Sequence, residues 1–137
     1  MKMEGFILKK VTEAIQKEFK KTVLNKEVDF FNGIIKKWGY DPENGGSKES
    51  IFIIPLIKGE KSPSLEVYIY PLVESVNVVI NYFPAKTGLI ALQRSNSALA
   101  GLKIISEHLV MANKLKDEKK IDNYFKDVNH KVHDDHN

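Results

Sequence analysis

Three histidines near the C-terminus have the spacing of metal ligands. His130, His133 and His136 recur every three residues, so a helix would bring neighbouring imidazoles to one side, where they could coordinate Zn²⁺ or Ni²⁺. The stretch is crowded with charged residues, and nothing around it would orient the imidazoles. We therefore expect a solvated tail here, with no physiological metal and no cofactor.

A polar cluster around Arg94 is a candidate anion site. Ser95 and Ser97 follow the arginine, and the first N–H groups of an expected helix come directly after them, where an anion would be attracted. The alternative is an arginine at the end of a strand and a serine that caps the helix. We favour that alternative and keep Arg94, Ser95 and Ser97 as anion-binding candidates.

Catalytic motifs are missing from the sequence. The chain has no cysteine, which excludes disulfides, thiolate nucleophiles and thiolate metal sites. It also lacks Gly-x-Ser-x-Gly, His-Glu-x-x-His, a dinucleotide fingerprint and a phosphate loop. His108 lies beside an apolar stripe and is expected on a helix surface or partly buried. These observations predict a protein that is not an enzyme.

The segment from 65 to 83 predicts a β-hairpin with two different faces. Strand alternation puts an aliphatic set on one face: Leu65, Val67, Ile69, Val76, Val78, Ile80 and Tyr82. Val79 lies on the other face with five aromatic or amide side chains, which are suited to a surface that is sometimes covered. These are the partner-binding candidates Tyr68, Tyr70, Asn77, Asn81 and Phe83. The competing interpretation is that a second layer of helices buries this face.

Positive charge is concentrated at the N-terminus. Residues 1–38 hold nine lysines against five acids, and a basic surface is expected from Lys9, Lys10, Lys17, Lys20 and Lys21. Arg94 is the only arginine among 21 basic residues, whereas arginine is the usual bidentate reader of guanine and phosphate. An acidic protein partner is therefore expected before a nucleic acid.

Two segments before residue 39 have helical periodicity. Apolar residues recur every three or four positions from 4 to 24 and again from 28 to 38, which predicts two helices with a break near Asn25. For the second segment a hairpin is the rival, because Asn32-Gly33 suits a tight turn.

Strands replace helices after a loop at 39–50. Four are expected, at 51–57, 65–72, 76–83 and 89–94, although the last also reads as the start of a helix. Apolar stripes then predict a helix from 98 to about 115 and a final amphipathic helix around 121–128. The order ααββββαα indicates an α+β fold with an antiparallel sheet, forming one domain over 1–129 with a flexible tail over 130–137.

The bulk composition predicts a globular protein. Apolar residues make up 42% and charged residues 28% of 137 residues, which suits one domain. No stretch has the length and hydropathy of a signal peptide or a membrane span, so the cytoplasm is the expected location. The leading hypothesis is a small protein-binding protein, such as an inhibitor, an immunity-type protein or an accessory protein, and a homodimer is a further expectation. The alternatives are a nucleic-acid-binding protein and an anion- or small-ligand-binding domain near Arg94.

Overall fold

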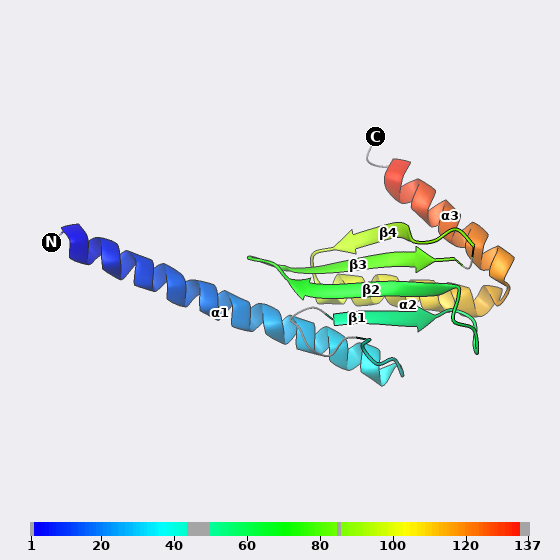
Figure 1. Cartoon of the computed structure of the whole chain (residues 1–137), viewed down its shortest axis with the longest axis horizontal. Helices are drawn as coiled ribbons and strands as arrows, with labels where there is room; N and C mark the ends of the chain where they lie inside the picture. Colours follow the sequence, from blue (N-terminus) through cyan, green and yellow to red (C-terminus); the bar gives the residue numbers. More distant parts are fainter. Residues whose placement is uncertain (1, 44–49, 85, 135–137) are drawn as a thin grey trace.

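The computed structural model describes residues 2–43, 50–84 and 86–134 (Figure 1). Its elements are α1 (Lys2–Lys37), β1 (Ser50–Pro55), β2 (Ser64–Pro71), β3 (Val76–Phe83), β4 (Ile90–Ser95), α2 (Ala98–Leu115) and α3 (Glu118–Asp134). The strands form one antiparallel sheet in the order β1-β2-β3-β4. The predicted α+β class and the four strands are confirmed, including the strand that also read as the start of a helix.

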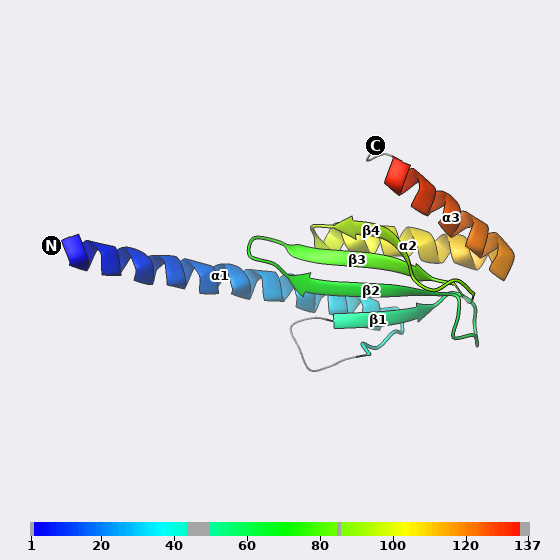
Figure 2. The same ribbon diagram turned by 45° about the horizontal axis from the view of Figure 1, so that its top comes forward.

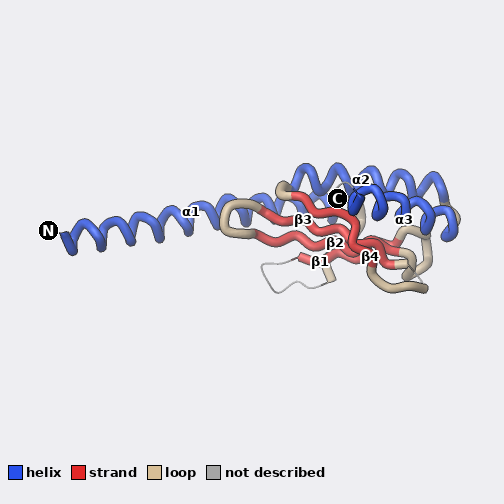
Figure 3. The backbone as a smooth tube through the Cα atoms, turned by 90° about the horizontal axis from the view of Figure 1, so that it is seen from above, coloured by secondary structure: helices blue, strands red, loops and turns tan. Residues whose placement is uncertain are grey.

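All the described helices pack on one face of the sheet. α1 contacts β2, α2 contacts β3, and α3 contacts β4. Figures 2 and 3 show these helices on the same side of the strands, with no helix of the described chain on the other side. The second helical layer that the sequence left open as an alternative is therefore absent from the described residues.

Strand alternation sorts the hairpin side chains as expected. In the β2–β3 ladder Val67 lies opposite Ile80, and Ile69 lies opposite Val78. The whole aliphatic set from Leu65 to Tyr82 is at most 1% exposed. Phe52 and Ile54 of β1 extend this buried surface, so the core lies between the sheet and the helices.

α1 is one continuous helix without the expected break near Asn25, and the hairpin alternative at Asn32-Gly33 is wrong. Leu24, Val28, Phe31 and Ile35 have 3.6-residue periodicity and are buried against the sheet. The apolar positions before residue 24 lie about 170° away around the same helix, since each residue turns the helix by about 100°. The sequence therefore contains a change of face in one helix, which resembles the boundary between two helices.

α2 begins as the sequence predicted. The Ser97 hydroxyl accepts a hydrogen bond from the Ala100 N–H at 3.1 Å, which caps the helix. Gly101 in the first turns lies directly on β3, where a Cβ atom would come within 2.7 Å of Cγ1 of Val78. This close contact brings the helix axis near the sheet.

α3 continues beyond the point where the sequence predicted a flexible tail. The helix runs through His130 to Asp134, and residues 135–137 lie outside the described residues. The Asn129 amide donates to the Ala91 carbonyl of β4 at 2.6 Å, and Val132 is partly buried. These contacts extend the helix because they give its last turns a surface to pack on. None of the described helices combines the length and hydropathy of a membrane span.

Candidate functional site

The face of the sheet that no described helix covers carries aromatic, aliphatic and polar side chains. One row runs across all four strands, because Tyr68 pairs with Ile51 and Val79, and Val79 pairs with Arg94. Tyr68 and Val79 are partly buried, whereas Arg94 is exposed. Tyrosine and arginine are the side chains most often found at the energetic centre of protein interfaces.

A second row orients one of the tyrosine rings. Tyr70 pairs with Asn77 across β2 and β3, and the Asn77 amide donates to the Tyr70 hydroxyl at 2.5 Å. Asn77 is only 3% exposed. The hydrogen bond holds the Tyr70 hydroxyl next to Asn77 on the open face.

The five predicted partner-binding residues differ in exposure. Phe83 is 40% exposed, and Tyr68 and Tyr70 are partly buried. Asn77 and Asn81 are buried despite the absence of a described helix above them, since short side chains beside longer ones keep little exposed surface. The exposed area of this set therefore comes mainly from the aromatic rings, and the two asparagine side chains lie buried beside them.

The structure does not bring Arg94, Ser95 and Ser97 together. Arg94 lies opposite Val79 on the open face, whereas Ser95 lies opposite the buried Val78 on the helical face. The Ser95 hydroxyl is buried without a hydrogen-bond partner in the described chain, and the Ser97 hydroxyl caps α2. Strand alternation thus separates residues that are adjacent in sequence, and Arg94 joins the aromatic face instead.

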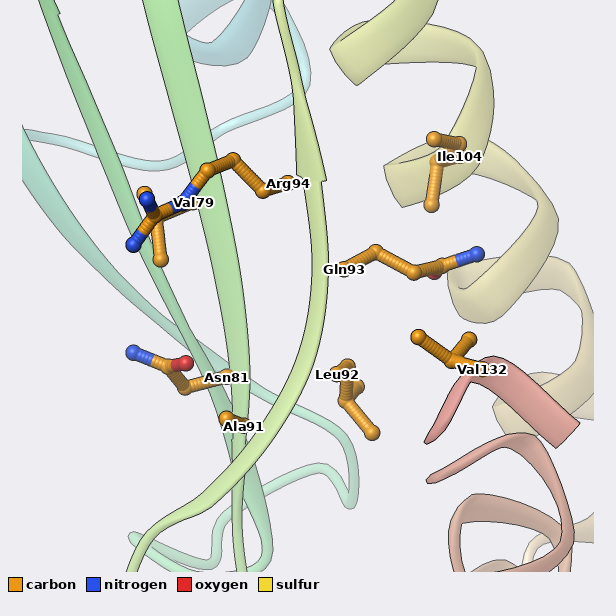
Figure 4. Close-up of a pocket in the computed structure, with 8 residues that line it drawn as sticks. All are labelled: Val79, Asn81, Ala91, Leu92, Gln93, Arg94, Ile104 and Val132. Carbon is orange, nitrogen blue, oxygen red and sulfur yellow. The ribbon is translucent and has the colours of Figure 1, made fainter. Parts of the chain in front are cut away.

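A cavity of about 370 Å³ borders this face at β4 (Figure 4). Its lining consists of Val79, Asn81, Ala91, Leu92, Gln93, Arg94, Ile104 and Val132. The ladder between β3 and β4 is irregular at Ile80/Asn81, and Figure 4 shows Leu92 and Gln93 on the same side of β4. Such a β-bulge re-aims side chains, and here the Arg94 side chain extends over Val79.

The charge of the open face is balanced. The four strands contain no lysine; their only charged residues are Glu66 on β2 and Arg94 on β4. Glu66 pairs with Asn81, one row away from the Tyr68 row. A surface that binds the phosphate backbone of a nucleic acid needs an excess of positive charge, and these strands do not supply one.

The predicted basic surface belongs to the N-terminal two-thirds of α1. Lys9, Lys10, Lys17, Lys20 and Lys21 are all within the helix, but their side chains lie outside the described ones. Figure 1 shows this part of α1 projecting beyond the sheet. The lysine-rich segment and the aromatic face are thus separate regions of the molecule.

The predicted histidine triplet falls partly outside the described residues. His130 is exposed on α3, the His133 side chain is not described, and His136 lies beyond the described chain. Among the side chains that are described, no group of three potential ligands could hold a metal ion.

His108 is buried in a hydrogen-bonded cluster on the helical side of β4. Its Nε2 atom lies 2.7 Å from Oε1 of Gln93, and its Nδ1 atom lies 2.9 Å from the Tyr124 hydroxyl. The amide oxygen of Gln93 can only accept, so Nε2 carries the proton and Nδ1 accepts from Tyr124. Burial lowers the pKa of His108 to about 4, which keeps the ring neutral. His108 therefore links β4 to α2 and α3 and has a structural role.

Stability is expected to fall in acid because of His108. An unfolded histidine titrates near pH 6.5, so between pH 6.5 and 4 the unfolded chain binds the proton that the folded chain excludes. The free energy of unfolding should therefore fall by about 2 kcal/mol at pH 5 and about 3 kcal/mol at pH 4. Urea unfolding of the natural chain and of His108→Gln across this range measures the effect. Equal pH dependence in both chains would contradict the prediction.

Sequence reasoning found the aromatic rows but missed the cavity beside them. Gln93 and Leu92 line it because of the bulge, and Val132 does so because α3 is longer than predicted. The hydrophobic periodicity of the sequence predicts neither the bulge in β4 nor the full length of α3. Comparison of the chain with models of protein families, with curated proteins and with solved structures gave no match.

Proposed function

We propose that this protein binds another protein through the open face of its sheet and acts without catalysis, as an inhibitor, an immunity-type protein or an accessory protein of the cytoplasm. The observation that supports this proposal is the arrangement of Tyr68, Tyr70 and Phe83 on a face that no described helix covers. Partly exposed tyrosine rings supply contact area at a low cost in side-chain entropy, since they have two rotatable bonds.

Charge favours a protein partner over a nucleic acid. The strands offer one arginine and one glutamate, so the face has no field that would attract a polyanion. The lysine-rich part of α1 adds long-range attraction for an acidic partner, and attraction of this kind raises association rates more than affinity. We therefore assign binding energy to the aromatic face and electrostatic steering to α1.

Alanine substitution of Tyr68, Tyr70 and Phe83 is expected to weaken capture of the partner at least tenfold. Loss of a well-packed aromatic contact typically costs more than a factor of ten in affinity. The measurement is affinity capture from the native host lysate, with the natural chain and the triple variant as baits, followed by mass spectrometry.

A control bait distinguishes this face from general surface hydrophobicity. Leu99 and Val110 of α2 are 57% and 53% exposed, so Leu99→Ala with Val110→Ala removes a similar type of surface from a helix and should retain the partner. Capture that is equal for the triple variant and the natural chain, with the fold intact, would refute the proposal. Loss of the captured material after nuclease treatment, or a steep fall of its binding with salt, would favour nucleic acid instead.

A further inference from the structure

The first two-thirds of α1 expose an apolar ridge that the core does not use. Val11, Ile15, Phe19 and Val23 are 50%, 65%, 71% and 47% exposed, and they follow one another at four-residue intervals. We call these four residues the N-terminal ridge. Figures 1 and 2 show the helix projecting beyond the sheet in this region. A helix in water gains most of its stability from packing an apolar face, so a ridge of this length indicates a missing neighbour.

The geometry of the ridge fits a second copy of the same helix. Residues at i, i+4, i+8 and i+12 form a row inclined to the helix axis, and two such rows interdigitate when the helices cross at about −50°. Two copies of the same helix meet this requirement without any further feature. We propose that the N-terminal ridge packs against the N-terminal ridge of a second copy of this chain, in a two-fold crossing centred between Ile15 and Phe19.

The distribution of charge permits this pairing. Lysines 9, 10, 17, 20 and 21 occupy helix positions about 100° to 180° from the centre of the ridge, so the crossing keeps these positions of the two helices apart. The positions about 80° to either side of the ridge centre are Gln16 and Glu18, both exposed. An anionic membrane or an acidic helix docked on the ridge would meet few of the lysines, which argues for a second copy.

The proposal is independent of partner binding at the sheet. The ridge lies on the projecting part of α1, and the aromatic rows lie on β2 and β3. Two crossing helices bury less than the roughly 1,600 Å² of a standard stable interface, so we expect a weak, concentration-dependent dimer.

Sedimentation velocity of the purified full chain from about 10 µM to about 1 mM tests the association, a range that suits an interface of less than standard size. The natural chain should shift from monomer to dimer within this range. Ile15→Ser with Phe19→Ser should weaken the dimer at least tenfold. Leu99→Ser with Val110→Ser, which changes apolar residues of α2 that are also more than half exposed, should leave it unchanged. All substituted residues are exposed, and circular dichroism at low concentration checks that each variant is folded.

The position of the contact is tested separately. The chain has no cysteine, so Glu18→Cys and Asp127→Cys each give a single site for a spin label. Residue 18 borders the ridge and residue 127 lies on α3, and both are exposed. The distance between labels on the two copies should be shorter for residue 18 than for residue 127.

Four results would overturn the proposal. The first is a monomer at every concentration, and the second is a dimer that survives the Ile15→Ser, Phe19→Ser change. The third is a label distance that is not shorter at residue 18. The fourth is ridge-dependent binding to phosphatidylglycerol vesicles by a chain that stays monomeric, because this would assign the ridge to a lipid surface.

Discussion

Replacement of Phe31 by alanine is expected to lower the free energy of unfolding by about 3 to 5 kcal/mol, the range for a fully buried phenylalanine. Phe31 is 0% exposed, and its ring centroid lies 6.2 Å from that of Phe52 on β1. Alanine would leave a cavity between α1 and the sheet that rigid neighbours fill only in part. Urea or thermal unfolding measures the loss.

The adjacent residue provides a matched control. Phe30 is on the same turn of α1 and is 52% exposed, so Phe30→Ala should change stability by only about 0.5 kcal/mol. Both variants lose the same atoms and gain the same helix propensity. Equal losses for the two variants would mean that α1 does not dock through the face that contains Phe31.

Substitution of Gly101 by alanine is expected to destabilise the protein, although alanine favours helix formation. The added Cβ would lie 2.7 Å from Cγ1 and 2.9 Å from Cβ of Val78, and Val78 is fully buried on a central strand. Such overpacking costs about 1 to 3 kcal/mol. Either α2 moves away from the sheet or Val78 is displaced, and both changes disturb the core.

Gly33 is the control for this second prediction. It is also in a helix, but a Cβ built there meets nothing within 4 Å, so Gly33→Ala should stabilise the protein by about 0.5 to 1 kcal/mol through helix propensity. The two Gly→Ala changes therefore have opposite signs. An increase in stability from both would show that α2 does not approach β3 as closely as described.

The functional proposals use surfaces that the core leaves unused. On the sheet, alternation turns Tyr68 and Tyr70 away from the helices. On α1, the change of face near residue 24 turns Phe19 away from the side that packs. Each surface has its own test, and the variants for one do not alter the other.

Prediction from the sequence succeeded where a pattern is local. The boundaries of β3 and α2 follow from alternation, the Ser97 cap and the apolar stripe of α2. The separation of Val67 and Ile80 from Tyr68 onto opposite faces of the sheet follows from the two-residue period of a strand. These features need only the geometry of one element.

Three features were decided by contacts between distant segments. α1 is one continuous helix, and Phe31 and Ile35 near its end pack against the sheet. The sequence showed only two apolar stripes that point to different sides of the helix. α3 extends to Asp134 because its last turns pack on β4, where the Asn129 amide donates a hydrogen bond to the Ala91 carbonyl. His108 is buried and neutral, and its two ring nitrogens are hydrogen-bonded to Gln93 of β4 and Tyr124 of α3.

The sequence by itself determined the α+β class, the four strands and the residues on each face of the central hairpin, because alternation and helical periodicity are properties of neighbouring residues. Only the tertiary structure decided that the helices gather on one face, that Arg94 joins the tyrosines, and that Ser95 does not. The physical reason is that one face of the hairpin carries aliphatic side chains and the other carries aromatic side chains, so either face could have been buried. The choice rests on where the connections place the helices.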